Sequence, residues 1–335
     1  MAPATTGADS GQRHGGPSRR AILIAAAAGA ALVVTGAIAF HSSIERLLGP
    51  GGGMANEAAP MFVGSETCAG CHRAEAQLWR SSQHKHAMDH ATEKSVLGDF
   101  SDVGFEYYGV RTRFFRRDGK FLVETDGADG KLATFEVKYT FGVDPLQQYL
   151  IEFPDGRLQA LSIAWDTRPK DKGGQRWFHL YPSEEIKHDD ILHWTKLNQN
   201  WNFMCAECHS TNVRKNYDVT NNRFATTWTE ISVSCEACHG QGSRHLSWAH
   251  DRQSWWPFGR RDDPTKGLLA HFDERRGITW PRDPRSGEPR RSITPALLRR
   301  EVETCGRCHA RRSAVSEDWV PGRSSGWAAT TGSTT

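Results

Sequence analysis

The chain has 335 residues, with 42 Lys and Arg against 39 Asp and Glu, and its formal net charge is +3. A charge so close to balance gives no general case for nucleic-acid binding or for a polybasic membrane patch. Hydrophobic residues make up 38% of the sequence, and part of them form one apolar block near the N-terminus. The sequence therefore predicts that something other than aliphatic side chains fills much of the soluble core.

The first 61 residues have the pattern of a targeting segment with its flanks. Residues 21–40 carry no charge and follow two arginines, and a helix of about 20 residues spans a hydrocarbon core of about 30 Å. We predict a transmembrane signal-anchor here, with residues 1–20 as a disordered cytoplasmic N-terminus, residues 41–61 as a linker and the remainder in the periplasm. Small residues at the end of the apolar run leave a cleaved signal open as the alternative.

The folded part is predicted to begin at Phe62 and to extend to residue 312, before a disordered tail at 313–335. Residues 65–80 suit a short helix. Residues 105–165 contain short runs of β-branched and aromatic residues, which predict four or five antiparallel strands with turns at Asp-Gly pairs. These pairs are Asp118-Gly119, Asp126-Gly127, Asp129-Gly130 and Asp155-Gly156.

Two further helices are predicted later in the chain. Ser183 is a suitable N-cap for the first of them. Ile186, His193 and Leu197 would share one face of this helix, which would turn His193 inward. A loop-rich stretch follows until Thr294-Pro295, which predicts the start of a second helix.

All eight cysteines occur in CxxC pairs, and each pair is followed at once by histidine. In c-type haem attachment the two sulfurs bond to one porphyrin, and the histidine is the proximal ligand of its iron. Zinc ribbons, dithiol sites and structural disulfides also use paired cysteines but do not need the histidine. We predict four covalent haem c groups, whose apolar plates supply the missing core. In chain order, the first to fourth motifs are CAGCH (Cys68, Cys71, His72), CAECH (Cys205, Cys208, His209), CEACH (Cys235, Cys238, His239) and CGRCH (Cys305, Cys308, His309).

The sixth ligand of each iron decides the function, because a second imidazole suits electron transfer and an open position permits substrate binding. His193 is a candidate through its helical face. His245 follows His239 too closely to reach round its own porphyrin with ease, which favours a neighbouring haem. One of His84 and His86 is also expected to be a ligand, and methionine ranks below histidine.

The chain resembles the multihaem cytochrome c-552/4 family from Phe62 to His309. The likeness implies a periplasmic tetrahaem carrier in which second histidines bind iron, and the matching positions are His84, His179, His193 and His245. Members of this kind often continue into further CxxCH sites and tetratricopeptide repeats, so the chain is expected to be a truncated member. The motifs that carry the resemblance are FVGSETCAGCH, SSQHKHAM, YTFGVDPLQQYL, GGQRWFHLYP, LHWTKLNQNWNFMCAECHSTN and CEACHGQGSRHLSWA.

Together these features predict an α+β fold. The N-terminal membrane helix would be followed by a haem-packed, mostly helical and loop-rich multihaem domain at 62–312, into which a small antiparallel sheet is inserted at 105–165. We predict a membrane-anchored periplasmic tetrahaem cytochrome c that carries electrons between respiratory redox partners. Residues 251–312 have an excess of Lys and Arg, which predicts a docking face for an acidic partner.

Two other functions remain open from the sequence. One is a periplasmic oxidoreductase that acts on a small nitrogen or sulfur compound at a five-coordinate haem. Active sites of nitrite-reducing multihaem enzymes resemble one another in having a CxxCK motif. The sequence contains no CxxCK motif, which weighs against this enzyme. The other is a haem-bearing module for partner assembly, in which redox chemistry is incidental.

Overall fold

The computed structural model describes residues 59–253, 263–293, 300–310 and 320–321. The predicted signal-anchor, almost all of the predicted linker, the helix start at Thr294-Pro295 and the predicted tail beyond Pro321 lie outside the described residues. Among the residues that are described, no helix combines the length and the apolar character needed to cross a membrane. The described residues from Pro60 onward belong to one compact unit.

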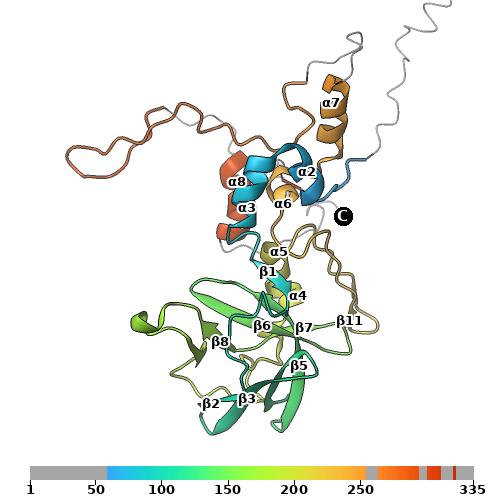
Figure 1. The fold of residues 1–335 in the computed structure, drawn as a ribbon, viewed down its shortest axis with the longest axis vertical. Coiled ribbons are helices and arrows are strands. Elements are labelled where there is room, and N and C mark those ends of the chain that lie inside the picture. The colour runs from blue at the N-terminus through green and yellow to red at the C-terminus, as the bar shows by residue number, and fades with distance from the viewer. Residues whose placement is uncertain (1–58, 254–262, 294–299, 311–319, 322–335) are drawn as a thin grey trace, which may run out of the picture. The chain divides into compact units, whose positions relative to one another are not determined.

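A nine-stranded antiparallel sheet is the largest element (Figure 1). Seven strands pair in the order β2-β3-β4-β5-β6-β8-β9, while β1 pairs with β5 and β7 pairs with β6. A separate two-stranded hairpin joins β10 (Tyr217–Asp218) to β11 (Arg223–Phe224). The strands of the large sheet are β1 (Met88–His90), β2 (Val103–Tyr107), β3 (Val110–Arg117), β4 (Lys120–Asp126), β5 (Leu132–Phe141), β6 (Leu146–Glu152), β7 (Leu158–Ala160), β8 (Ile163–Asp166) and β9 (Arg176–His179).

Turn chemistry explains two of the strand connections. Asp118 and Gly119 both have positive φ, 53° and 73°, as a tight hairpin between β3 and β4 requires. Gly156 has φ 78° between β6 and β7, and a Cβ there would lie 2.0 Å from the carbonyl oxygen of Phe224. These two positions agree with the turns that the Asp-Gly pairs predict.

The core of the sheet is mostly aromatic. Phe114 and Trp177 stack with ring centres 3.6 Å apart, and Phe100 meets both of them edge-on. Such contacts bury much area for each ordered side chain, so the sheet has a core made of protein alone. This cluster consists of Phe100, Phe114, Phe121, Val123, Val137, Tyr149, Ile151, Leu161, Ile163, Trp165, Trp177 and Trp194.

A second cluster joins the sheet to the short helices. Trp201 is fully buried in it and packs with Met88, Leu158 and Ala206, so α4 lies against β7. Further contacts link α4 to α5, α5 to α8, and α2 to α3 and α6 (Figure 1). The helices are α2 (Ser65–Cys71), α3 (Arg73–Arg80), α4 (Trp201–Met204), α5 (Ala206–His209), α6 (Cys235–His239), α7 (Ser243–Gln253) and α8 (Arg300–His309).

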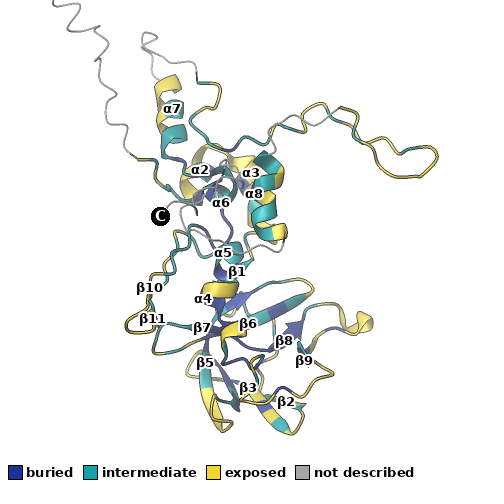
Figure 2. Cartoon of the chain, turned by 180° about the vertical axis from the view of Figure 1, so that it is seen from behind, coloured by how far each residue is buried: buried dark blue, intermediate teal, exposed yellow. Residues whose placement is uncertain are grey.

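The predicted fold class is wrong, because the described chain is mostly β with few helices. The strands extend beyond 105–165, from Met88 to His179. Buried side chains concentrate in the sheet, whereas the helices are mostly half-buried or exposed (Figure 2). Aromatic side chains fill the core of the sheet, and a count of aliphatic residues alone does not register them.

The helix predicted from Ser183 is also absent from the structure, since residues 183–196 form successive turns. The Asp190 carboxylate accepts a hydrogen bond from the backbone N–H of Leu192 at 2.8 Å, which is a local turn that competes with helix formation. His193 nevertheless points inward, as predicted, and is 4% exposed. The predicted helix at 65–80 is present as α2 and α3, with a break at His72.

Candidate functional site

The four CxxCH motifs lie on or beside short helices. In α2, α6 and α8 the paired cysteines are three residues apart and therefore share one helix face. The motif histidine ends α5, α6 and α8, and His72 separates α2 from α3. Each motif thus presents two sulfurs and one imidazole from a single helical turn, which is the donor set that haem c attachment requires.

The first and third motifs enclose a cavity of about 210 Å³. Trp79 on α3 forms part of its wall, and the indole N–H of Trp79 donates to the carbonyl of Val233 at 2.9 Å. The cavity therefore combines an apolar wall with donors that can bind a porphyrin and its iron. Donor residues from both motifs and from the segment after α3 line it, namely Cys68, His72, His84, Cys235, Cys238 and His239.

A buried carboxylate joins the first and third motifs. Glu236, the first residue between the cysteines of the third motif, is 1% exposed. Its oxygens accept hydrogen bonds from the backbone N–H groups of Val63 at 2.9 Å, Gly64 at 2.8 Å and Gly242 at 2.8 Å. One side chain thereby fixes the residues before α2, the helix α6 and the residue before α7.

An ion pair joins the second and fourth motifs. The Nη2 atom of Arg307, inside CGRCH, lies 2.9 Å from Oε1 of Glu207, inside CAECH. Both side chains are 25% exposed. A hydrogen bond between the Cys208 and Cys308 thiols lowers the pKa of Cys208 to about 7, so sulfurs of these two motifs are also neighbours.

Two pairs of imidazoles stand at the spacing of two ligands on one metal. The ring centres of His72 and His245 are 5.9 Å apart, and those of His84 and His309 are 6.2 Å apart. Two metal–imidazole bonds of about 2 Å, with roughly 1 Å from nitrogen to ring centre, place two such rings about 6 Å apart. The residues of the first and fourth motifs therefore fit a six-coordinate iron.

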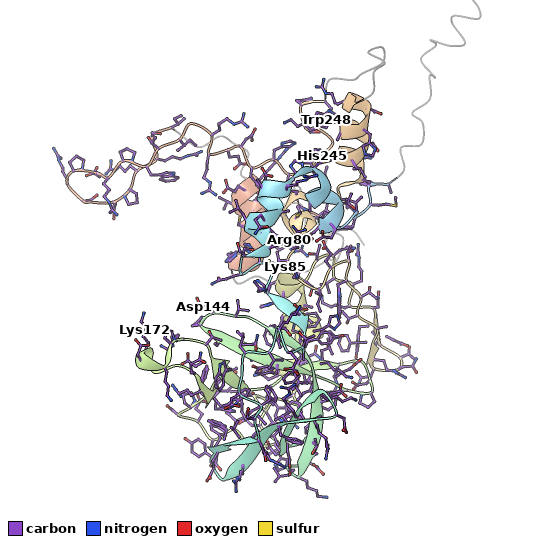
Figure 3. The ribbon with its side chains drawn as sticks, in the orientation of Figure 1. Arg80, Lys85, Asp144, Lys172, His245 and Trp248 are labelled. Atoms are coloured by element: carbon purple, nitrogen blue, oxygen red, sulfur yellow. The ribbon has the colours of Figure 1, made fainter. Side chains whose placement is uncertain are left out.

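Backbone carbonyls orient several of these histidines. The Nδ1 atom of His245 lies 2.7 Å from the Lys266 carbonyl, and that of His209 lies 2.9 Å from the Ala87 carbonyl. Donation from Nδ1–H leaves the Nε2 lone pair free to bind a metal. His245 also stacks on Trp248 of α7, with ring centres 5.6 Å apart (Figure 3).

His179 and His193 have a different environment from the motif histidines, in a small pocket of the large sheet. The Nδ1 atom of His179 accepts a hydrogen bond from the Tyr181 N–H at 3.1 Å, so its neutral ring carries the proton on Nε2. His193 Nε2 lies 3.1 Å from Oδ2 of Asp126. Within the described chain, neither ring makes a ring contact with a motif histidine, and their role as iron ligands stays a prediction.

The motif histidines His209 and His239 meet phenylalanine rings. Phe141 lies edge-on to His209 with centres 5.4 Å apart, and Phe272 lies 4.9 Å from His239. In the part of the chain that the structure describes, neither forms a ring contact with another imidazole. Burial lowers the pKa of both histidines, which favours the neutral imidazole that metal binding needs.

Sequence reasoning identified the motif residues but missed what holds the motifs together. Glu236, Glu207 and Arg307 occupy the two variable positions inside CxxCH, which the haem chemistry leaves free. Opposite charges at such positions in two motifs are a signal that could have suggested the Glu207–Arg307 pair. His84 and His86 are both exposed, and among the described residues only His84 of the two has a ring contact, with His309.

Comparison with known proteins gives one family match. Residues 67–101 and 165–240 match the family model of cytochrome c554 and c-prime, and these segments contain the first three motifs. No curated protein matches the chain. A solved structure, the undecaheme cytochrome from the S-layer of Carboxydothermus ferrireducens, is similar at 19% identity with a TM-score of 0.33. The similarity covers 63% of this chain and 23% of that one, so the chain spans about a quarter of that protein.

The family match falls on the segments that hold the first, second and third motifs and the predicted ligands His84, His179 and His193. The fourth motif has the same donor set on α8 and lies against α5. These findings support covalently bound haem c and electron transfer as the chemistry of the site. The motifs and the family match together support a multihaem cytochrome of the c type.

Proposed function

We propose that the chain is a tetrahaem c-type electron carrier on the periplasmic side of the cytoplasmic membrane. The observation that carries this proposal is the pair of imidazole contacts, His72 with His245 and His84 with His309. Bound haem c supplies reversible one-electron chemistry, and two imidazoles on one iron leave no position for a substrate. A six-coordinate iron is therefore suited to passing electrons on.

The protein residues have separate roles in this proposal. The eight motif cysteines would hold the four porphyrins, and His72, His209, His239 and His309 would each bind the iron of their own motif. His245 and His84 would supply the second histidine at the first and fourth motifs. His245 follows the third motif in the chain and His84 follows the first, so each would bind an iron held by a different motif. Folding of the chain and completion of the iron sites would therefore depend on each other.

Export and redox partners are part of the same proposal. The apolar run at 21–40 after two arginines supports export, and haem c is attached outside the cytoplasm. Donor and acceptor would be redox proteins of a respiratory chain. Within residues 251–312, Arg275 pairs with Glu301 and Arg290 pairs with Asp283, so part of the positive charge there is already neutralised by the chain.

Spectroscopy of the purified holoprotein tests the axial pairs. We expect His84→Ala and His245→Ala each to convert one haem from low spin to high spin, measured by electron paramagnetic resonance. His86→Ala is the matched control for His84 and should leave the spectrum unchanged. Mass spectrometry should find four haems in every variant, and it should also locate the mature N-terminus. A low-spin spectrum that survives both ligand substitutions would remove the basis of the proposal.

The environment of His209 favours a second candidate function. This ring faces Phe141 edge-on, and a phenylalanine cannot bind iron. A five-coordinate haem at the second motif would support an oxidoreductase acting on a small nitrogen or sulfur compound. Binding of carbon monoxide or nitric oxide to one ferrous haem of the wild-type protein would favour this candidate, and its failure to bind would favour the carrier.

A further inference from the structure

A groove of about 580 Å³ lies beside the second motif. Its walls come from the turn between β6 and β7, from residues 195–203, which include most of α4, and from the β10–β11 hairpin. None of the CxxCH residues lines it, so it is distinct from the cavity between the first and third motifs. Its lining includes the cationic and apolar side chains of Arg157, Lys196, Lys215, Leu197, Phe203 and Tyr217.

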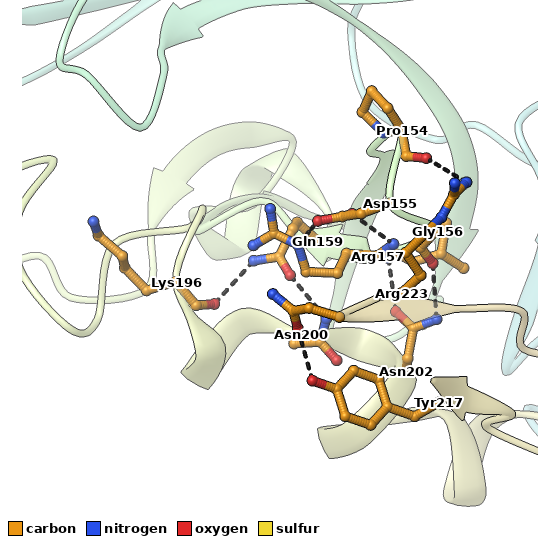
Figure 4. Close-up of polar contacts among 12 residues, drawn as sticks. Pro154, Asp155, Gly156, Arg157, Gln159, Lys196, Asn200, Asn202, Tyr217 and Arg223 are labelled. Atoms are coloured by element: carbon orange, nitrogen blue, oxygen red, sulfur yellow. Dashed lines mark hydrogen bonds and ion pairs between the residues drawn. The ribbon is translucent and has the colours of Figure 1, made fainter. Parts of the chain in front are cut away.

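The floor of the groove is held by buried amides. The Gln159 side chain is fully buried and donates to the carbonyls of Trp194 and Lys196, both at 2.9 Å. It also accepts a hydrogen bond from Asn200 Nδ2 at 3.0 Å. Asn202 donates to the Gly156 carbonyl at 3.1 Å (Figure 4). Because these bonds satisfy the amides within the chain, the groove is part of the fold and does not need a ligand to form.

The charge of the groove is positive. Three cationic side chains, Arg157, Lys196 and Lys215, line it against one carboxylate, Asp155. Arg157 Nε lies 2.7 Å from Asp155 Oδ2, so these two charges offset each other, and Lys196 and Lys215 supply the remaining positive charge. Lys196 has no ion pair among the described residues. A positive potential in a concave surface attracts acidic groups and speeds the encounter with an acidic molecule.

Exposed apolar side chains surround the groove. Leu197 is 66% exposed, Phe203 is 59% exposed and Tyr217 is 44% exposed, and Met204 beside them is 55% exposed. A cluster of large apolar side chains in contact with water, rimmed by charge, is typical of a protein interaction site. Lys215 lies over the Phe203 ring, with its Nζ atom 5.5 Å from the ring centre, so charge and apolar surface are contiguous.

The position of this surface connects it to the second motif. Phe203 and Met204 are in α4, and Cys205 follows at once in the chain. Asn200 caps α4 by accepting a hydrogen bond from the Phe203 N–H at 3.0 Å, which fixes the helix that ends at this cysteine. A molecule that covers the groove therefore lies beside the site where a porphyrin is attached.

We propose that this groove is the docking site for an acidic redox protein, the electron acceptor of the carrier described above. Carboxylates of that partner would face Lys196 and Lys215, and its apolar surface would cover Leu197 and Phe203. One electron passes to the oxidised one-electron centre of the partner, and no proton or covalent bond is exchanged. The proposal rests on the proposed function, which supplies the reduced haem.

Stopped-flow oxidation of the reduced holoprotein tests the docking site. The oxidants are plastocyanin, as an acidic copper protein, and ferricyanide, as a small anion. We expect Lys196→Glu to lower the second-order rate constant with plastocyanin about tenfold at low salt, and this effect should vanish near 0.5 M salt. Lys172→Glu, in the exposed 3₁₀ turn at Lys170–Lys172, is the matched charge reversal outside the groove and should change the rate less than twofold.

The apolar surface separates a protein partner from a small anion. Phe203→Ser should lower the plastocyanin rate several-fold and change the ferricyanide rate less than twofold, because a small anion has no apolar surface to bury. Equal losses with both oxidants, or a Lys172→Glu effect as large as that of Lys196→Glu, would overturn the docking site. If the wild-type protein transferred electrons to neither oxidant, the carrier function itself would fail. Haem content and far-ultraviolet circular dichroism establish that each variant is folded.

Discussion

Glu236 connects segments that lie far apart in the chain. Its carboxylate accepts backbone hydrogen bonds from residues 173 and 172 positions earlier, at Val63 and Gly64, and from Gly242 six positions later. Gly242 precedes α7, which carries His245. The arrangement of the first motif, the third motif and the segment that carries His245 therefore depends on one buried carboxylate of the third motif, which accepts backbone N–H bonds from the other two segments.

Glu236→Gln should weaken this arrangement without changing the volume of the side chain. An amide nitrogen cannot accept the backbone N–H bonds, so we expect a loss of about 2–4 kcal/mol in the free energy of unfolding. The high-spin signal at the first motif should also increase, because His245 loses its fixed position. Denaturant unfolding and electron paramagnetic resonance measure the two effects. Glu106→Gln, at an exposed position of β2, is the control and should stay within 0.5 kcal/mol of wild type.

The sequence predicts the role of a residue where the residues that act with it are close in the chain. It does not predict the role where those residues are far away in the chain. Cys68, Cys71 and His72 form a pattern within five positions, and that pattern is complete in the sequence. The ring contacts His72–His245 and His84–His309 join residues far apart in the chain, so no spacing rule predicts them. The role of Glu236 is hidden for the same reason, since its partners at Val63 and Gly64 offer only backbone N–H groups.

At the scale of elements, turns were predictable and one helix was not. The Asp118-Gly119 hairpin depends on two residues that tolerate positive φ, and it occurs where the sequence places it. The apolar spacing after Ser183 fits a helix equally well, but Asp190 forms a local turn and Ile186 packs near the sheet through a bond from its N–H to the Tyr107 hydroxyl at 3.3 Å. Tertiary contacts therefore determine the conformation of this segment, as they commonly do where the helical pattern is weak.

The turn between β6 and β7 allows a sharp test of packing. Gly156→Ala places a methyl group 2.0 Å from the Phe224 carbonyl oxygen and also strains a φ of 78°. We expect a destabilisation of about 3 kcal/mol or more, because both the backbone and the β10–β11 hairpin must move. Gly109→Ala is the matched control, since its φ is 84° but no atom lies within 4 Å of the new methyl group. That variant should lose only about 1–2 kcal/mol in urea unfolding. If both variants lost the same free energy of unfolding, the close approach of Phe224 to Gly156 would not contribute to the effect.

The large sheet should lose stability in acid. Burial lowers the pKa of His179, at the end of β9, from its ordinary value to about 4. A histidine whose folded pKa is depressed stabilises the fold fully above about pH 6.5, and that stability is lost as the pH falls toward 4. The expected loss is about 3 kcal/mol across this window at most. His179→Phe keeps the stacking on Tyr107 and should flatten the dependence, measured by urea unfolding at pH 7, 6, 5 and 4. An unchanged acid slope in this variant would assign the effect to another group.

At the scale of the whole molecule, the composition was correctly described but wrongly interpreted. Aliphatic residues are few, yet the sheet forms a core from Phe114, Trp177 and their neighbours. The motif helices have little buried protein of their own, with Ser65 the one buried residue of α2 and Thr304 that of α8 among the described side chains. In the described chain, the sheet therefore has a core of its own side chains. The motif helices are held by Glu236 and by the Glu207–Arg307 pair, and we expect the bound haem groups to hold them as well.

This division predicts how the protein responds to loss of haem. A variant with all eight motif cysteines changed to serine cannot form thioether bonds, so it should be made without covalent haem. We expect its sheet to remain folded and to unfold cooperatively, because the aromatic cluster contains no motif residue. Backbone amides of α2, α6 and α8 should exchange with deuterium at least tenfold faster than in the holoprotein, since their packing depends on the bound groups.

Near-ultraviolet circular dichroism of the buried tryptophans and hydrogen exchange with mass spectrometry measure the two parts. If the tryptophan signal and cooperative unfolding disappeared together with helix protection, the haems would be part of a single core shared with the sheet. If the helices stayed protected, Glu236 and the Glu207–Arg307 pair would suffice to hold them.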